Sequence, residues 1–228
     1  MENKIISVAI DGPAGAGKSS IAKAAAAQLG IVYIDTGAMY RAVGLEATRR
    51  GISLDDAEAL GQLMKSFDIG IKYIDGAQRV FLGDEDVSEA IRTPEMSMAA
   101  SRVSAHAPVR EALVELQRGL ARKGSSIMDG RDICTHVLPN ADVKIFLTAS
   151  LEARAERRLR ELLEKGQNVT FEEVREDMAK RDYNDSHREN SPLIQAPDAE
   201  LLDTSDMTLD EAIEAVVSRI KEKTKDVL

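Results

Sequence analysis

The sequence of 228 residues contains one cysteine, three histidines and no tryptophan. The single cysteine, Cys134, excludes a disulfide within the chain and a zinc site made of several thiolates. A reducing, cytoplasmic location is therefore expected, because disulfides are rare in that compartment. His106, His136 and His187 lack the spacing of metal ligands and are expected to be structural or surface residues. No run of about 18 apolar residues occurs, so the sequence predicts no membrane-spanning helix and no membrane partner.

Basic residues are also in deficit. Lys and Arg total 30 against 39 Asp and Glu, which gives a net charge of −9. A general nucleic-acid binder usually carries a basic face, so we expect no nucleic-acid partner. A phosphorylated small molecule is compatible with this charge, because arginines can cluster locally on an acidic protein. Eighteen of the basic residues are arginine, and seven of them lie between Arg154 and Arg188, where they favour bidentate contacts with phosphate.

What the sequence does contain is typical of a globular α/β protein. Hydrophobic residues make up 43% and charged residues 30%, which excludes a disordered or fibrous chain. Short apolar runs predict strands at 5–10, 31–34, 126–129, 143–147 and 199–203. Helices are predicted at 18–29, 38–50, 54–66, 94–107, 108–123, 151–165, 171–185 and 209–223. This alternation predicts a parallel five-stranded sheet with helices on both faces.

The stretch from Ile69 to Val87 has a different pattern. Apolar residues alternate with glycine and polar residues on either side of Asp75-Gly76, a dipeptide that favours a hairpin turn. We therefore predict a small antiparallel unit at 64–101, inserted into a single domain that spans 1–228. The core of that domain is predicted at 1–63, 102–150 and 190–228.

A glycine-rich turn follows the first predicted strand and matches G-x-x-x-x-G-K-[ST] at every fixed position. It consists of Gly12, Pro13, Ala14, Gly15, Ala16, Gly17, Lys18 and Ser19. The glycines let backbone N–H groups point at phosphate oxygens, and the following helix directs its positive end to the same place. Lys18 is expected to reach the β- and γ-phosphates of ATP, and the Ser19 hydroxyl to bind Mg²⁺. The adjacent Ser20 completes the predicted ATP-binding segment.

The phosphate loop does not by itself distinguish kinases from GTPases and ATPases. A GTPase is expected to carry an Asn-Lys-x-Asp string, which this sequence lacks, and no segment resembles a switch region. Two hypotheses follow from the residues: a kinase that acts on a small acceptor, and a regulatory module that hydrolyses ATP as a switch. The density of arginines favours the kinase.

Five motifs in a fixed order carry a family resemblance. They are Ile10 to Ser19, Asp35 to Arg41 (Asp-Thr-Gly-Ala-Met-Tyr-Arg), Asp129 to Asp132 (Asp-Gly-Arg-Asp), Val143 to Leu147 with Arg154, Arg157 and Arg158, and Arg181-Asp182 with Asp185 and Arg188. From Ile6 to about Val217 the sequence resembles the bacterial cytidylate kinases, which are P-loop nucleoside monophosphate kinases.

The resemblance implies transfer of the γ-phosphoryl group of ATP to CMP or dCMP, with Mg²⁺ as the cofactor. It also implies that the insertion at 64–101 is an NMP-binding subdomain and that 151–189 forms a helical lid with its flanking helices. We expect a monomer. The alternative is a kinase of the same fold for another acceptor, such as UMP, AMP or another small molecule.

Two arginines follow the second and third predicted strands, Arg41 on a helix and Arg131 on the strand's end. In a parallel sheet both lie near the carboxyl edge, where the phosphate loop also lies. They can then bind an acceptor phosphate in bidentate fashion; the alternative is a pair of surface salt bridges. The resemblance adds Thr36 to the substrate-binding residues and gives Arg131 a catalytic role as well.

The carboxylates of Asp129 and Asp132 can have two different roles. One can hold Mg²⁺ through water, and the other can accept a hydrogen bond from the exocyclic amine of cytosine. Uracil presents an acceptor at the same position, so a buried carboxylate would discriminate against it. The resemblance implies a catalytic role for Asp129 and base recognition by Ser101, Arg110 and Asp132. The alternative for Ser101 and Arg110 is an ordinary helix surface.

Arg181, Asp185 and Arg188 are spaced four and three residues apart, which places them on one helix face if the helix persists. The resemblance favours a clamp for the sugar and phosphate of the acceptor over a surface ladder of ion pairs.

Arg154, Arg157 and Arg158 share another predicted helix face. The resemblance implies that these lid arginines meet the charge that develops on the transferred phosphoryl group. The alternative is a surface ladder with Glu152, Glu156 and Glu161.

The sequence departs from the family pattern at two positions. Cys134 stands where the family usually has glycine, and it would be strained if that site required a positive φ. Ser20 stands where threonine is common and keeps the hydroxyl.

Overall fold

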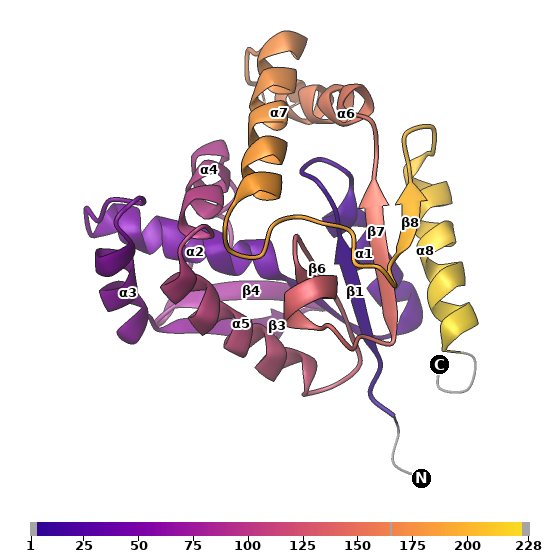
Figure 1. Ribbon diagram of the computed structural model, residues 1–228, viewed down its shortest axis with the longest axis horizontal. Coiled ribbons are helices and arrows are strands. Elements are labelled where there is room, and N and C mark those ends of the chain that lie inside the picture. Colours follow the sequence, from indigo (N-terminus) through magenta and orange to yellow (C-terminus); the bar gives the residue numbers. More distant parts are fainter. Residues whose placement is uncertain (1–3, 165, 225–228) are drawn as a thin grey trace. The chain divides into compact units, whose positions relative to one another are not determined.

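The computed structural model describes residues 4–164 and 166–224 (Figure 1). These residues divide into two compact units. The first comprises the chain up to Tyr33 and from Ala121 onward, and the second runs from Ile34 to Leu120. The predicted insertion, 64–101, lies inside the second unit, which also takes in 34–63 and 102–120.

The first unit is built on a parallel sheet. Among the described residues five strands form it, in the order β2-β6-β1-β7-β8. The strands are β1 (Ser7–Asp11), β2 (Val32–Asp35), β6 (Ser126–Gly130), β7 (Val143–Thr148) and β8 (Glu200–Asp203). Strand β1 pairs in parallel with both β6 and β7, and β7 with β8. The prediction of a parallel five-stranded sheet is therefore confirmed.

Apart from one short turn, the helices of this unit follow the strands as predicted. They are α1 (Lys18–Leu29), the π-helical turn η1 (Ile133–Val137), α6 (Leu151–Glu164), α7 (Phe171–His187) and α8 (Leu209–Lys223). The turn η1 was not predicted, because five residues show no helical periodicity. The prediction for α6 ended at 165, which lies outside the described residues. Within the described residues, none of the helices is both long and apolar enough to cross a membrane.

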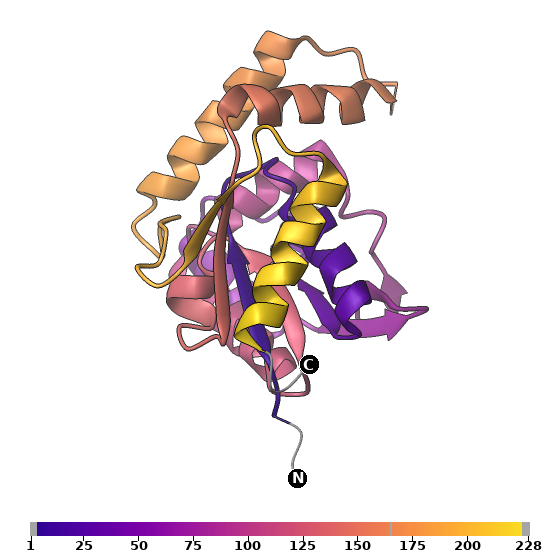
Figure 2. The same cartoon turned by 90° about the vertical axis from the view of Figure 1, so that its right-hand side faces the viewer.

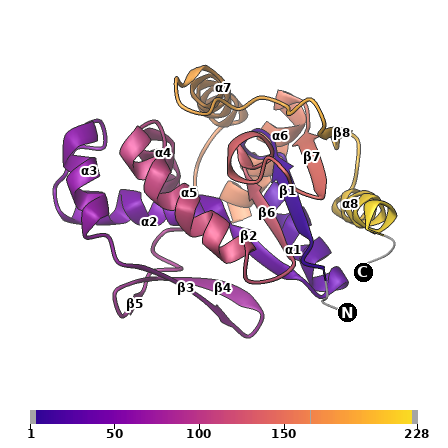
Figure 3. The same cartoon turned by 60° about the horizontal axis from the view of Figure 1, so that its bottom comes forward.

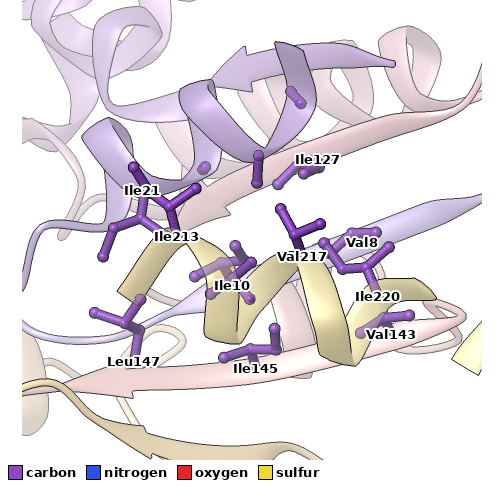
Figure 4. Packing of buried hydrophobic residues seen from close by; sticks show 14 of the residues in the cluster. Val8, Ile10, Ile21, Ile127, Val143, Ile145, Leu147, Ile213, Val217 and Ile220 are labelled. Atoms are coloured by element: carbon purple, nitrogen blue, oxygen red, sulfur yellow. The ribbon is translucent and has the colours of Figure 1, made fainter. Parts of the chain in front are cut away.

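The core of the first unit surrounds β1. Val8, Ala9 and Ile10 are completely buried, as expected for a central strand of a parallel sheet. Figure 4 shows Val217 and Ile220 of α8 packed toward the apolar side chains of the sheet. Helix α8 begins with a capping box in which Thr208 and Glu211 bond each other's backbone N–H groups, and such a pair satisfies two donors that a helix start leaves open.

The carboxyl ends of the strands define the functional edge of this unit. Strand β1 ends at Asp11 and leads directly into the phosphate loop, which is followed by α1. Helices α6 and α7 lie beyond the carboxyl ends of β7 and β8 (Figures 1 and 2). In open α/β sheets ligands bind at this edge. The fold therefore places the phosphate loop and the predicted lid helices at the same edge of the sheet, at the carboxyl ends of the strands.

The second unit carries its own small sheet, visible in Figure 3. Its elements are α2 (Thr36–Arg49), α3 (Ala57–Lys65), β3 (Ile69–Ile74), β4 (Ala77–Leu82), β5 (Glu85–Asp86), α4 (Pro94–Val103) and α5 (Ala107–Ala121). The predicted hairpin is confirmed: β3 and β4 are antiparallel and joined by Asp75 and Gly76, whose φ angles of 52° and 74° suit a tight hairpin turn. The two-residue strand β5 was not predicted, because it is too short to show alternation.

Candidate active site

The phosphate loop has a backbone that only glycine can adopt at two key positions. At Gly12, φ is 150° and an added Cβ would lie 1.9 Å from the carbonyl oxygen of Leu147. At Gly15, φ is 73° and a Cβ would lie 2.4 Å from Cε of Met178, on α7. The loop is therefore pressed closely against β7 on one side and against α7 on the other, which explains the glycines that the motif requires.

Lys18, the first residue of α1, is buried within the loop. Its Nζ donates to the carbonyl oxygen of Pro13 at 2.7 Å. Burial and the nearby Arg131 cation lower the pKa of Lys18 to about 7, although Asp129 and Asp11 act in the opposite direction. An ammonium group has three donors, so the bond to Pro13 leaves the group able to bind phosphate oxygens.

Ser19 and Asp129 form an oxygen pair beside the loop. The Ser19 hydroxyl donates to Oδ2 of Asp129 at 2.9 Å, and the Tyr33 hydroxyl donates to Oδ1 at 2.7 Å. A hydroxyl and a carboxylate are the hard oxygen ligands that Mg²⁺ takes when substrate phosphates supply others, so these residues fit that ion. Sequence reasoning missed Tyr33, which stands in a strand like many other aromatic residues.

Arg131, immediately after β6, meets α7. Its Nε donates to Oδ2 of Asp185 at 2.8 Å. Burial alone would raise the pKa of Asp185, but the Arg131 guanidinium outweighs it, and the pKa lies below its ordinary value. Two residues predicted to bind the acceptor are thus brought together from distant parts of the chain.

Arg181, one turn before Asp185 on α7, lies close to Arg131. Burial lowers the pKa of Arg181, and the Arg131 cation lowers it further. Its buried Nε has no hydrogen-bond partner among the described residues. Two adjacent guanidinium groups, one of which has an N–H group without a hydrogen-bond partner among the described residues, are suited to binding an anion such as an acceptor phosphate.

Arg188 does not lie on the helix face on which it was predicted. Helix α7 ends at His187, and Arg188 has extended backbone with φ −66° and ψ 142°, so the expectation that it shares a helix face with Arg181 and Asp185 is wrong. Its Nε instead donates to the carbonyl oxygen of Ser191 at 2.7 Å, and its Nη2 forms an ion pair with Asp132 at 3.6 Å. A tertiary contact therefore brings Arg188 to the predicted base-reading carboxylate.

The three predicted lid arginines have separate partners. Arg154 is buried, and its guanidinium donates to the carbonyl oxygens of Ala14 and Ala149, both at 2.9 Å, and pairs with Asp182 at 2.8 Å. It thus connects the phosphate loop to α6 and α7. Sequence reasoning gave Asp182 no role of its own.

The hydrogen bonds and ion pairs that Arg157 and Arg158 form with described residues go to segments other than the phosphate loop. Nη2 of Arg157 donates to the carbonyl oxygens of Thr204, Ser205 and Met207 at 2.5–3.4 Å. Arg158 pairs with Glu161 at 2.9 Å, as the surface-ladder alternative anticipates, and its charge helps to lower the pKa of Arg181. Their catalytic roles stay predictions.

Cys134 is accommodated without backbone strain. Outside glycine, the described residues with positive φ are Asp75 and Ser191, so the strain expected from a positive φ does not arise at Cys134. Its buried Sγ lies 3.5 Å from the carbonyl oxygen of Ala9, and burial raises the pKa of the thiol. A buried, protonated thiol behaves as a small apolar side chain.

The second unit holds its own charged cluster around Asp35, at the start of α2. The buried carboxylate accepts from Nη2 of Arg41 at 3.0 Å, from Nη1 of Arg92 at 2.9 Å and from the backbone N–H of Ala38 at 2.9 Å. A Cβ at Gly37 would lie 3.1 Å from Nη1 of Arg41, so glycine leaves room for this arginine to fold back. Arg41 is therefore held next to a second arginine that sequence reasoning missed.

The predicted residues Ser101 and Arg110 are each hydrogen-bonded to Ser104 in the second unit. Arg110 is buried, lies over the ring of Tyr40 at 5.8 Å, and donates to the carbonyl oxygen of Ser104 at 3.5 Å. The Ser104 hydroxyl in turn donates to the carbonyl oxygen of Ser101 at 2.9 Å. Thr36 is buried at the first residue of α2.

The Asp35 cluster gives a pH-dependent stability. Burial alone would raise the pKa of Asp35, but Arg41, Arg92 and the Ala38 amide together bring it below the ordinary 3.8. An ionised Asp35 therefore stabilises the fold above about pH 4, and this contribution is lost as the pH falls through the lowered pKa.

Replacing Asp35 with asparagine should lower the free energy of unfolding by about 2 kcal/mol at pH 7. Asparagine also caps helices well, so the loss isolates the charge. In thermal melts the difference between the two proteins should shrink as the pH falls below about 4 and through the lowered pKa of Asp35. A difference that stays constant over this range would contradict the assignment.

Comparisons with known proteins identify relatives of this chain. The cytidylate kinase family matches residues 8–222. A protein named cytidylate kinase from Caldicellulosiruptor bescii is 52% identical over 94% of this chain and 95% of its own. Another of that name, from a species of Exiguobacterium, is 50% identical over 96% of this chain and 98% of its own.

A solved structure of an uncharacterized protein from Eubacterium ventriosum is similar in fold. It covers 96% of this chain and 99% of its own, with a TM-score of 0.53 and 14% sequence identity, so it supports the fold alone. The family match over nearly the whole chain and the relatives at about half identity lead to one conclusion. This chain belongs to the cytidylate kinase family.

Proposed function

We propose that this protein transfers the γ-phosphoryl group of ATP to CMP or dCMP and releases ADP with CDP or dCDP. One observation carries the proposal most directly. The phosphate loop, with Lys18 and the Ser19–Asp129 pair, shares a compact unit with the cationic pair of Arg131 and Arg181. A donor site and an acceptor-phosphate site belong to one kinase fold, and the family match supplies the acceptor class.

The donor is assigned to the segment from Gly12 to Ser20. Its backbone N–H groups and the start of α1 would bind the phosphates of ATP, with Lys18 on the β- and γ-phosphates. Ser19 and Asp129 would hold Mg²⁺, the carboxylate directly or through water. When bound, that ion neutralises charge on the β- and γ-phosphates. Tyr33 keeps the Asp129 carboxylate oriented toward Ser19.

The acceptor is assigned to predicted residues following the family resemblance. In the first unit, Arg131 and Arg181 would bind its phosphate. Asp185 and Arg188 would contact its sugar and phosphate, and Asp132 its base. The family resemblance also predicts substrate contacts for Thr36, Arg41, Ser101 and Arg110, which lie in the second unit.

The reaction needs positioning and charge stabilisation rather than a nucleophilic side chain. An acceptor phosphate oxygen attacks the γ-phosphorus, and the bond from that phosphorus to the β–γ bridging oxygen breaks as ADP leaves. Holding both substrates in line and offering cations to the transferred group lowers the barrier. Arg154 would keep the loop in place through Ala14. The monomeric state, the cytoplasmic location and the lack of a nucleic-acid partner stay predictions.

The test is ADP release from Mg·ATP with CMP, dCMP, UMP and AMP in parallel, beside a reaction without acceptor. We expect strong dependence on CMP and dCMP and weak use of UMP and AMP. Turnover that ignores every nucleotide would contradict the kinase assignment and favour a regulatory ATPase. Preference for another nucleotide would keep the fold and the donor site but replace the acceptor.

Base recognition gives a sharper prediction. Replacing Asp132 with alanine should reduce kcat/KM by about tenfold to a hundredfold for CMP and much less for UMP, because the carboxylate accepts from an amine that cytosine carries and uracil lacks. Asp177→Ala, an exposed carboxylate change on α7, is the matched control and should leave both values unchanged. Equal losses with the two acceptors would remove Asp132 from base recognition.

A further inference from the structure

Asp11 is a buried carboxylate that the proposed chemistry does not use. It is the last residue of β1, its side chain is completely buried, and the phosphate loop begins at the next residue. A buried charge is costly unless strong hydrogen bonds compensate for it. Its presence at the end of an otherwise apolar strand therefore calls for a specific partner.

The partners are two backbone amides from a distant segment. The N–H of Ile133 donates to Oδ1 of Asp11 at 2.8 Å, and the N–H of Cys134 donates to Oδ2 at 2.7 Å. Both amides follow Asp132 directly. The carbonyl oxygen of Asp132 accepts from the N–H groups of His136 and Val137 at 2.9 and 3.1 Å. The backbone on the carboxyl side of Asp132 is thus held by Asp11 and by the turn η1 together.

Strand pairing explains why a side chain is needed at this point. In the parallel pair of β1 and β6, Asp11 lies opposite Gly130, the last residue of β6. Beyond Gly130 no ladder bond with β1 holds the chain, yet the next two residues are Arg131 and Asp132. The Asp11 carboxylate continues the connection to β1 where the backbone ladder stops, and it does so with charge-assisted bonds, which are stronger than neutral ones.

The electrostatic surroundings show that this arrangement has a cost. Burial and, to a smaller extent, the Asp132 charge raise the pKa of Asp11 to about 6, although the two amides act in the opposite direction. The Asp11 charge in turn acts to raise the pKa of Lys18 and of Arg131. If the Asp11 side chain only filled space, an apolar side chain of similar size could replace it without loss of folding stability.

We propose that Asp11 is a positioning residue for acceptor recognition, which fixes the backbone after Gly130 and so places the Asp132 carboxylate against the cytosine base. The inference rests on the proposed function and adds to it a residue that touches neither substrate. It also links the two sites, because the strand that carries the phosphate loop places the segment that recognises the acceptor.

The experiment compares acceptor selectivity in Asp11→Asn and wild type. The amide of asparagine can accept only through its single oxygen, so one of the two backbone N–H groups loses its partner. We expect the ratio of kcat/KM for CMP to that for UMP to fall about tenfold, with KM for ATP within about twofold of wild type. This ratio does not depend on the fraction of active enzyme, so a loss of stability alone leaves it unchanged.

A matched control lies at the other end of the same strand. Asp142 accepts from the backbone N–H of Ser7 at 2.9 Å, so Asp142→Asn also removes a carboxylate that binds a backbone amide. It should leave the selectivity ratio unchanged. If Asp142→Asn lowers the ratio as much as Asp11→Asn does, the effect is a general one on β1 and the proposal is wrong.

A double variant tests whether Asp11 acts through Asp132. In an Asp132→Ala background, Asp11→Asn should change the ratio no further. A further tenfold change there, or equal losses for CMP and UMP in the single variant, would overturn the proposal.

If Asp11→Asn does not fold, Asp11→Glu provides a second test. It keeps the charge, displaces it by one methylene, and should lower the same ratio of kcat/KM values. An unchanged ratio would contradict the proposal. Wild type without a preference for CMP would instead contradict the proposed function.

Discussion

Replacing Lys18 with methionine should reduce kcat by about a hundredfold to a thousandfold, with no loss of thermal stability. The ammonium group is assigned to the β- and γ-phosphates, where charge develops as the bond to the leaving ADP breaks. Removal of one preorganised donor of this kind typically reduces kcat by about 10²–10³. Methionine matches the length of lysine and fits a buried site.

The stability half of this prediction follows from burial. Burial and the nearby Arg131 lower the pKa of Lys18 to about 7, which means that the folded protein holds the charged form at a cost. A neutral side chain of similar size removes that cost, so the melting temperature should stay the same or rise. Lys23→Met, an exposed change on the same helix, should leave both kcat and melting temperature unaltered.

ADP release with saturating CMP measures kcat, and circular dichroism measures the melting temperature. If Lys18→Met retained kcat within tenfold of wild type, the assignment of the loop to the transferred phosphate would be wrong. If kcat and melting temperature fell together, the loss of activity would reflect unfolding instead.

Replacing Arg131 with methionine should lower kcat/KM for CMP by about a hundredfold or more, while KM for ATP changes little. The variant removes a cation assigned to the acceptor phosphate. It also leaves the Asp185 carboxylate, which Arg131 holds at 2.8 Å, buried without that partner. An unpaired carboxylate next to the acceptor phosphate would repel it, so two effects act in the same direction.

Further variants separate these two effects. Arg131→Lys keeps the charge but loses the planar fork of donors, and it should give an intermediate loss of about tenfold. In Arg131→Met, a second change of Asp185→Asn should recover stability without recovering use of CMP. Arg219→Met, an arginine on α8 that pairs with Glu200, is the control. Unchanged KM and kcat for CMP in Arg131→Met would remove this residue from the acceptor site.

Local sequence patterns were sufficient for much of the fold. The limits of α1 and α8 agree with prediction at both ends, and the hairpin turn at Asp75-Gly76 is where its dipeptide indicated. These features depend on contacts within a few residues, such as helix capping and the φ angles of turns. The phosphate loop belongs to the same class, since its glycines, Lys18 and Ser19 are contiguous in the chain.

Interactions between distant segments could not be predicted in this way. Ser19, Tyr33 and Asp129 form one hydrogen-bonded group, although Tyr33 and Asp129 are separated by 96 positions. The contact exists because β6 follows a long excursion of the chain and then returns beside β1. The sequence predicted a functional role for Asp129, but only the strand order brings Tyr33 to its carboxylate.

Arg188 and Arg157 show the same limit at closer range. Helical periodicity placed Arg188 on the face of Arg181 and Asp185, but α7 ends one residue earlier, and Arg188 meets Asp132 through its own turn. Periodicity also grouped Arg157 with Arg154, yet only Arg154 bonds to the phosphate loop. Helix spacing describes which side chains share a face, but not which neighbour that face will meet.

The sequence by itself therefore determined the parallel sheet, the phosphate loop and the chemical types of the residues around it, because propensity, turn geometry and motif spacing act over short stretches. Only the tertiary structure decided which of those residues touch. The order of strands in the sheet brings Asp11 to the amides of Ile133 and Cys134, 122 and 123 positions away, and bonds of that range depend on how the whole chain packs.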